Sequence, residues 1–267
     1  MQISRWLLIC TLLTTFLGLP ARSAEKAKPV LLYSRYFNAE GEDRYQPDGT
    51  FKSILDQIKP QLDVVVHNKP LTPENLKGVN LVLIANPSDK AVKEGPAPHH
   101  FSPVDIKNLT TFVQKGGGLI IMGNQENHNL EVEDTNKLLK NFGLQFTNLY
   151  TDAKKLIIAK DVPVLGGLTW AYYTGNLVEI EKGHPAHPRA LVNNDLDQKP
   201  AKGMRDQPGA LLAVSEPGKG RVAVITDAGW LTETALDGRG IGGVAIKDHD
   251  NLQIFLLLAS WLTRNPR

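Results

Sequence analysis

Short apolar runs alternate with helix-like segments over the first 146 residues of the chain. The runs lie at residues 28–33, 62–67, 80–85 and 119–122. They are too short to be core helices, and they lack the apolar-polar alternation of a half-exposed strand. They therefore indicate strands that are buried on both faces.

Between these runs, apolar residues recur at helical spacing. The helical segment that contains Ile106 is preceded by the start signal of a helix, a capping box made by Ser102 and Asp105 with Pro103 at the first helical position. The apolar positions are Phe51, Ile54, Leu55 and Ile58 in the first segment and Ile106, Leu109, Phe112 and Val113 in the second. This alternation predicts an α/β fold with a mainly parallel sheet and helices on both faces, of the flavodoxin-like type.

The second half of the chain has a weaker pattern. Residues 210–214 and 221–226 are apolar runs joined by turn residues, which predicts an added antiparallel hairpin. A glycine-rich surface loop is expected at 237–243 and a last amphipathic helix at 251–263. Because no linker or internal repeat interrupts the pattern, residues 25–267 are predicted to form a single domain.

Residues 1–24 have the pattern of a cleaved signal peptide. Arg5 precedes an apolar stretch at 6–19, Pro20 ends it, and small residues at 21–24 allow cleavage near Ser23. No other segment is apolar and long enough for a membrane span. The sequence therefore predicts a secreted or periplasmic protein without a membrane span in the mature chain.

Composition narrows the function classes. The chain has 30 basic and 28 acidic residues, and both excess charges, Arg5 and Arg22, lie in the leader. The mature chain is therefore neutral, which argues against a nucleic-acid partner. The single cysteine, Cys10, also lies in the leader, so the mature chain has no disulfide and no thiol nucleophile.

Several motifs occur in a familiar order. They are FSPVDIKNLTTFVQKGGGLIIMGNQENHN, TNKLLKNFGLQF, GHPAHP and GKGRVAVITDAGWLTE. In order and spacing this set resembles the class I glutamine amidotransferase-like superfamily, and most of all the branch that holds ThuA-like proteins and the non-catalytic GIFT-type domains. The resemblance implies the superfamily's α/β fold, and its ThuA-like side implies carbohydrate as a ligand.

The same resemblance implies where a nucleophile would be. The amidotransferases keep a cysteine on a strand-to-helix turn, and the matching turn here is at 122–125, where Asn124 and Gln125 stand instead. An amide side chain has no ionisable nucleophilic group. Glutaminase chemistry is therefore excluded, and we expect a binding domain in preference to an enzyme.

Ligands of open α/β sheets bind beyond the carboxyl ends of the strands. The polar and aromatic residues at these ends can hydrogen-bond hydroxyl groups and pack on a sugar ring. The candidate ligand-binding residues are Arg35, Tyr36, Asn86, Asn124, Gln125, Glu126, His128, Asp227 and Trp230. We expect Asn124, Glu126 and Asp227 to line one solvent-reached pocket, with Trp230 or Tyr36 at its rim.

Two other readings remain open. A metal-assisted or acid–base hydrolase would pair Glu126 or Asp227 with His128, His184 or His187. No hydrolase motif supports this function. A proline follows each of the last two histidines, so both are expected in a loop and not on a ligand-bearing helix. A scaffold with a protein partner in the cell envelope is the third class. The sequence predicts no cofactor and no metal; the expected partner is a carbohydrate or another polar small molecule.

Overall fold

The computed structural model describes residues 27–264, apart from the side chain of Glu126. The predicted signal peptide, residues 1–24, lies outside this range. Strands and helices do not alternate regularly along the chain. Among the described residues, the strands are β1 (Val30–Ser34), β2 (Asp63–His67), β3 (Leu81–Ala85), β4 (Gly118–Met122), β5 (Leu144–Phe146), β6 (Lys154–Ile157), β7 (Thr169–Tyr172), β8 (Val178–Ile180), β9 (Arg189–Asn193), β10 (Ala210–Ser215) and β11 (Arg221–Ile225).

Helices are few and mostly short. The α-helices of the described range are α1 (Lys52–Ile58), α2 (Pro103–Gln114), α3 (Glu133–Leu139), α4 (Glu233–Leu236) and α5 (Asn251–Thr263). Single 3-10 turns occur at η1 (Glu126–His128), η2 (Lys140–Phe142) and η3 (Gly229–Leu231). The capping box expected at Ser102 and Asp105 is confirmed at the start of α2.

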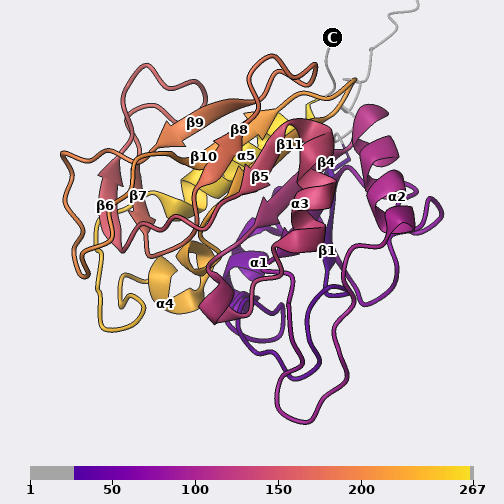
Figure 1. Ribbon diagram of the computed structural model, residues 1–267, viewed down its shortest axis with the longest axis horizontal. Coiled ribbons are helices and arrows are strands. Elements are labelled where there is room, and N and C mark those ends of the chain that lie inside the picture. The colour runs from indigo at the N-terminus through magenta and orange to yellow at the C-terminus, as the bar shows by residue number, and fades with distance from the viewer. Residues whose placement is uncertain (1–26, 265–267) are drawn as a thin grey trace, which may run out of the picture.

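Nine of the described strands form one mixed sheet, in which β2, β1, β3, β4, β11, β10, β8 and β5 follow one another and β9 pairs with β10. The pairings from β2 to β11 are parallel, whereas β10 is antiparallel to β11, β8 and β9, and β5 is antiparallel to β8. Figure 1 shows this antiparallel half beside the parallel strands. A separate antiparallel pair joins β6 to β7.

The prediction of a mainly parallel, flavodoxin-like sheet was therefore wrong. The expected hairpin exists as β10 and β11, but it belongs to an antiparallel half that includes three further strands. Two of them, β5 and β8, have only three residues each, too few for a hydrophobic pattern to show in the sequence.

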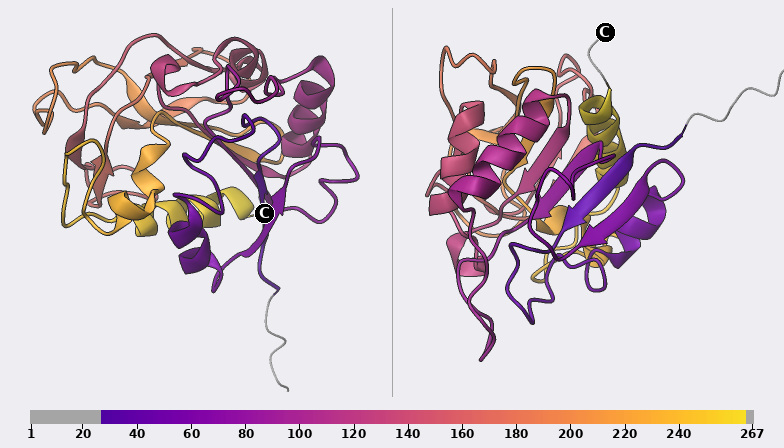
Figure 2. Two further views of the ribbon diagram at one scale, coloured as in Figure 1. Left: turned by 90° about the horizontal axis from the view of Figure 1, so that it is seen from below. Right: turned by 90° about the vertical axis from the view of Figure 1, so that its right-hand side faces the viewer.

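Two apolar clusters cover the two faces of the sheet. Along β4, Ile120 and Met122 belong to the cluster with α1 and α5, while Leu119 and Ile121 belong to the cluster with α2 and α3. Figure 2 shows these helix pairs on opposite sides of the sheet. Burial on both faces explains the continuous apolar run of β4. This packing also holds the carboxyl end of β4 in place, and the candidate site begins at that end.

Candidate functional site

Three loops meet where β3, β4 and β11 end. Asn86 follows β3, Asn124 follows β4 and Asp227 follows β11. Since β4 lies between the other two strands and is parallel to both, these residues share one edge of the sheet. The long segment after β1 brings the buried Tyr45 to the same place.

Asn86 holds the loop after β4 in place. Its backbone has a φ of 47°, in the left-handed region that asparagine tolerates better than most residues. The side-chain oxygen accepts a hydrogen bond from the Asn124 N–H at 2.9 Å, and the side-chain nitrogen donates to the carbonyl of His128 at 3.0 Å. Both ends of the 124–128 turn are therefore tied to one buried amide.

Asn124 orients the imidazole of His128. The Asn124 side-chain nitrogen donates to the Tyr45 hydroxyl at 3.0 Å, which leaves its Oδ1 facing His128 Nδ1, also at 3.0 Å. An amide oxygen can only accept, so Nδ1 carries the proton and Nε2 keeps a free lone pair. Burial, together with the positive charges of Arg44 and Arg205, lowers the pKa of His128 below its ordinary value of 6.5.

Asp227 is a buried structural carboxyl group. Its Oδ2 accepts from the Tyr173 N–H at 2.7 Å and its Oδ1 from the Gly229 N–H at 2.6 Å. Burial raises the pKa of Asp227 to about 7, although the backbone donors oppose the shift.

Just before Asp227, the Thr226 carbonyl lies so close to Gly175 that a Cβ at Gly175 would overlap it. This close approach joins β11 to the segment between β7 and β8.

A cavity of about 440 Å³ opens beside this network. Gln125, Asn127 and His128 form one wall, and residues from four later segments form the others. The remaining lining residues are Asp152, Ala153, Tyr173, Thr174, Lys202, Gly203, Arg205, Ile241, Gly242 and Val244. A volume of this size suits a small polar ligand.

Arg205 forms the most strongly anchored charged group of the cavity. Its Nε and terminal nitrogen contact Asp152 Oδ1 at 2.9 Å and 2.5 Å, and its other terminal nitrogen donates to Gln125 Oε1 at 3.2 Å. The guanidinium also lies 5.3 Å from the ring centre of Tyr150. About half of the Arg205 side chain remains exposed, so it can contact a ligand.

The predicted site residues have different positions. Gln125 and His128 line the cavity, while the side chains of Asn86 and Asn124 are buried behind it. Arg35 pairs with Asp48 at 3.1 Å, and Tyr36 stacks on His99, and neither belongs to the cavity lining. The side chain of Glu126 is outside the described part of the structure.

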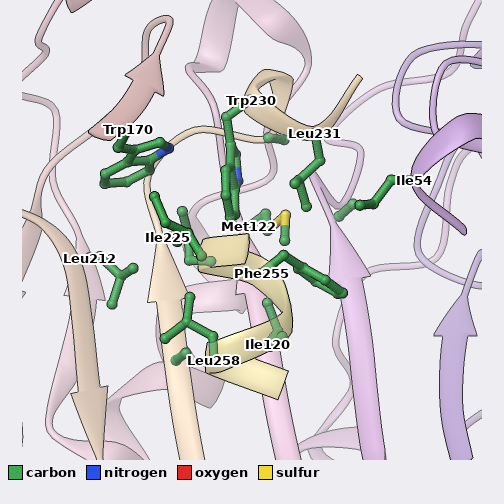
Figure 3. Close-up of a cluster of buried hydrophobic side chains, with 14 of the residues drawn as sticks. Ile54, Ile120, Met122, Trp170, Leu212, Ile225, Trp230, Leu231, Phe255 and Leu258 are labelled. Carbon is green, nitrogen blue, oxygen red and sulfur yellow. The ribbon is translucent and has the colours of Figure 1, made fainter. Parts of the chain in front are cut away.

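Asp227 and Trp230 do not reach solvent. Both are 0% exposed, so the expected solvent-reached position of Asp227 and the expected rim position of Trp230 were wrong. Trp230 packs edge-on against Trp170 at a centroid distance of 5.5 Å, inside the apolar cluster that Figure 3 shows. The Trp230 ring is part of the apolar core, because η3 directs it inward, toward β11 and α5. Tyr36 is likewise absent from the rim.

Sequence reasoning missed Asp152, Lys202 and Arg205. They lie in segments without a helical or strand pattern, and no local signal marks them. The glycine-rich stretch at 237–243 was recognised as a surface loop, and its Ile241 and Gly242 border the cavity. Tertiary contacts, such as the ion pair between Asp152 and Arg205 and the hydrogen bond from Lys202 to the Gly242 carbonyl, bring these segments together.

Two other features of the described residues compete with this site. A larger cavity of about 600 Å³ lies near the amino ends of β3 and β4, between α2 and residues 73–80, but its lining includes no carboxylate and no histidine.

The side chains of His100, Glu131 and Asp134 lie close enough to one another to hold a metal ion. Glu131, however, accepts the N–H groups of Asp134 and Thr135 at the start of α3, and Asp134 pairs with Lys137. We therefore assign these carboxylates to helix capping and surface pairing.

No protein-family model matches the chain, and no curated protein sequence matches it. Solved structures do match by fold. The mmIFT52 N-terminal domain has a TM-score of 0.63 at 17% identity, covering 88% of this chain and 97% of that one. A ThuA-like protein from Bacteroides uniformis has a TM-score of 0.52 at 11% identity, covering 92% and 95%.

The cytoplasmic protein STM1381 from Salmonella typhimurium LT2 has a TM-score of 0.54 at 13% identity, with 88% of this chain and 100% of that chain covered. At such low identities these likenesses concern the fold alone. The fold of this chain is therefore similar to that of ThuA-like proteins.

Within the described residues, no helix has the length and apolar character needed to cross a membrane.

Proposed function

We propose that this chain is an exported, non-thiol domain of the amidotransferase-like superfamily, from its ThuA-like and GIFT-type branch. We propose that it binds a hydroxyl-rich small molecule, such as a carbohydrate, in the cavity beside His128. The observation that carries the proposal is the convergence of Gln125, His128 and Arg205 on one cavity of about 440 Å³. A binding partner in the cell envelope would be compatible with the same fold.

The chemistry of the cavity supports a hydroxyl-bearing ligand. Arg205 supplies N–H donors, and His128 Nε2 supplies an acceptor. Hydroxyl groups both donate and accept, so a sugar can satisfy both kinds of group at once. The turn that carries His128 is fixed by buried amides, which reduces the ordering cost of binding.

A melting-temperature screen with neutral and acidic mono- and disaccharides tests the proposal. We expect at least one saccharide to raise the melting temperature of the wild-type protein. Asn127 is an exposed residue of the cavity wall, and Asn127→Trp should block the cavity and abolish the shift. Asn68→Trp places the same ring on an exposed residue outside the cavity lining and should leave the shift unchanged. If no saccharide raises the melting temperature of the wild type, the proposal is wrong.

The second candidate is an acid–base hydrolase, and the free lone pair of His128 Nε2 favours it. A neutral imidazole that is held by Asn124 and lines a cavity can take a proton from water. The test is hydrolysis of the saccharides that bind. Turnover that His128→Ala abolishes, while binding persists, would establish catalysis, whereas binding without turnover supports the binding domain.

A further inference from the structure

We propose that the ligand of this cavity is a sugar acid, whose carboxylate binds at Lys202 and Arg205 and whose hydroxyl group donates to His128 Nε2. This inference rests on the proposed function, since it names the ligand class of the same cavity. It excludes neutral sugars as the preferred ligands.

The charges around the cavity do not cancel. Asp152 is the only carboxylate among the described lining residues, and its oxygens are occupied. Oδ1 accepts from the Arg205 guanidinium, and Oδ2 accepts from the backbone N–H groups of Met204 and Arg205 at 3.0 Å and 2.8 Å. The Asp152 side chain is only 13% exposed. Its negative charge is therefore directed at Arg205 and not at the cavity.

Lys202 supplies the uncompensated charge. Within the described part of the chain it forms no ion pair, and its ammonium group donates to the carbonyl of Gly242 at 3.0 Å. This contact holds the ammonium group beside the glycine-rich loop that borders the cavity. An ammonium group has three donors, so two remain for an anion.

The neighbouring imidazole of His128 lies in a positive potential to which Arg205 contributes. After burial, the positive charges of Arg44 and Arg205 are the main causes that lower the pKa of His128. A field that opposes a proton on His128 favours a negative charge nearby. Arg44 itself pairs with Glu42 at 2.6 Å, so its contribution at the cavity is partly neutralised.

The lining residues of the cavity select two different kinds of ligand group. The Nε2 lone pair of His128 accepts a hydrogen bond, so it repels a carboxylate and selects a hydroxyl donor. Lys202 and Arg205 only donate, so they select an acceptor, best a carboxylate. A sugar acid carries both groups on one ring, which a neutral sugar or a simple carboxylate does not.

Titration calorimetry with matched pairs tests the inference. The pairs are D-glucuronate with D-glucose, D-galacturonate with D-galactose, and D-mannuronate with D-mannose, each at low and high salt. We expect the acidic member of at least one pair to bind about tenfold or more tightly than its neutral partner. High salt should weaken only the acidic member.

Lys202→Gln should remove most of this preference. Lys199→Gln is the matched control, because Lys199 is an exposed lysine that also donates to a backbone carbonyl, that of Leu196, and does not line the cavity. Equal or tighter binding of the neutral members overturns the sugar-acid inference but leaves the proposed function standing. A preference that survives Lys202→Gln overturns the role of Lys202. Absence of binding by every member contradicts the proposed function itself.

Discussion

The carboxamide oxygen of Asn124 lies 3.0 Å from Nδ1 of His128, and this contact leaves Nε2 of the imidazole as the unprotonated nitrogen. The turn after β4 therefore acts as a positioning element, with an amide that directs a histidine toward a cavity.

Asn124→Asp should raise the pKa of His128 from below 6.5 to above it. The new carboxylate would lie about as close to Nδ1 as the amide oxygen does, and a buried negative charge stabilises the imidazolium. An NMR titration of the His128 ring protons measures the change. Asn127→Asp, on the exposed wall of the cavity, should shift the pKa less. An unchanged His128 pKa in Asn124→Asp would show that the contact does not control the imidazole.

Asp227 should make the protein less stable as the pH rises. Its pKa is about 7 in the folded protein and 3.8 when exposed, so between these values the folded state holds a proton that the unfolded state has released. The contribution of Asp227 to stability is therefore full below pH 3.8 and is lost as the pH rises through 7, by on the order of 4 kcal/mol. Urea unfolding between pH 5 and pH 8 measures this slope.

Asp227→Asn isolates that contribution, because the amide does not titrate. The variant should unfold with a flatter pH dependence than the wild type, whatever its absolute stability. His128 acts in the opposite direction, since its lowered pKa makes stability rise with pH near 6.5. If wild type and variant have parallel pH profiles, Asp227 does not titrate in this range.

Gly175→Ala should destabilise the protein by about 3 kcal/mol or more, because the new methyl group overlaps the Thr226 carbonyl and the backbone must move. Gly78→Ala is the matched control: its φ is +79°, but nothing lies within 4 Å of the added Cβ. That change should cost only about 1 kcal/mol, the strain of a left-handed alanine. Chemical denaturation compares the two, and equal losses would mean that the close approach is not required.

Asp206→Ala should cost about 3–5 kcal/mol. Lys154 is 0% exposed, and its ammonium group lies 2.6 Å from Asp206, so the variant leaves a buried charge without its carboxylate. The additional change Lys154→Met removes that charge and should restore much of the loss. Unfolding free energies of both variants provide the test, and a double variant no more stable than Asp206→Ala would contradict the explanation.

The strands β3 and β4 could be predicted from sequence as buried strands because all of their residues are buried. The strand predicted at 62–67 exists as β2, but it lies at the edge of the sheet and has no buried residue, so its predicted burial on both faces was wrong. The run Leu119–Met122 is apolar because alternate residues face two different clusters, and β4 is confirmed as a buried strand. By contrast, β6 alternates buried and exposed residues, with the charged Lys154 on the buried side. No pattern rule assigns a lysine to the core, because its burial depends on Asp206, which is distant in sequence.

The residues of the candidate site also fall into two groups, those that could be predicted from sequence and those that could not. Gln125 and His128 could be found because they follow a recognisable strand, at the edge where ligands of such sheets bind. Lys202 and Arg205 could not, since their segment has no regular structure and is held by Asp152 and Gln125. Asp227 and Trp230 were correctly located at a strand end, but the direction of their side chains is set by packing that sequence does not reveal.

Saturation-transfer NMR with a mixture of neutral and acidic saccharides tests most directly whether this cavity is the ligand site. The wild-type protein and Asn68→Trp should both transfer magnetisation to at least one saccharide, and Asn127→Trp should transfer none. Undiminished transfer in Asn127→Trp would show that the saccharide binds elsewhere, and no transfer in the wild type would show that the protein does not bind these ligands.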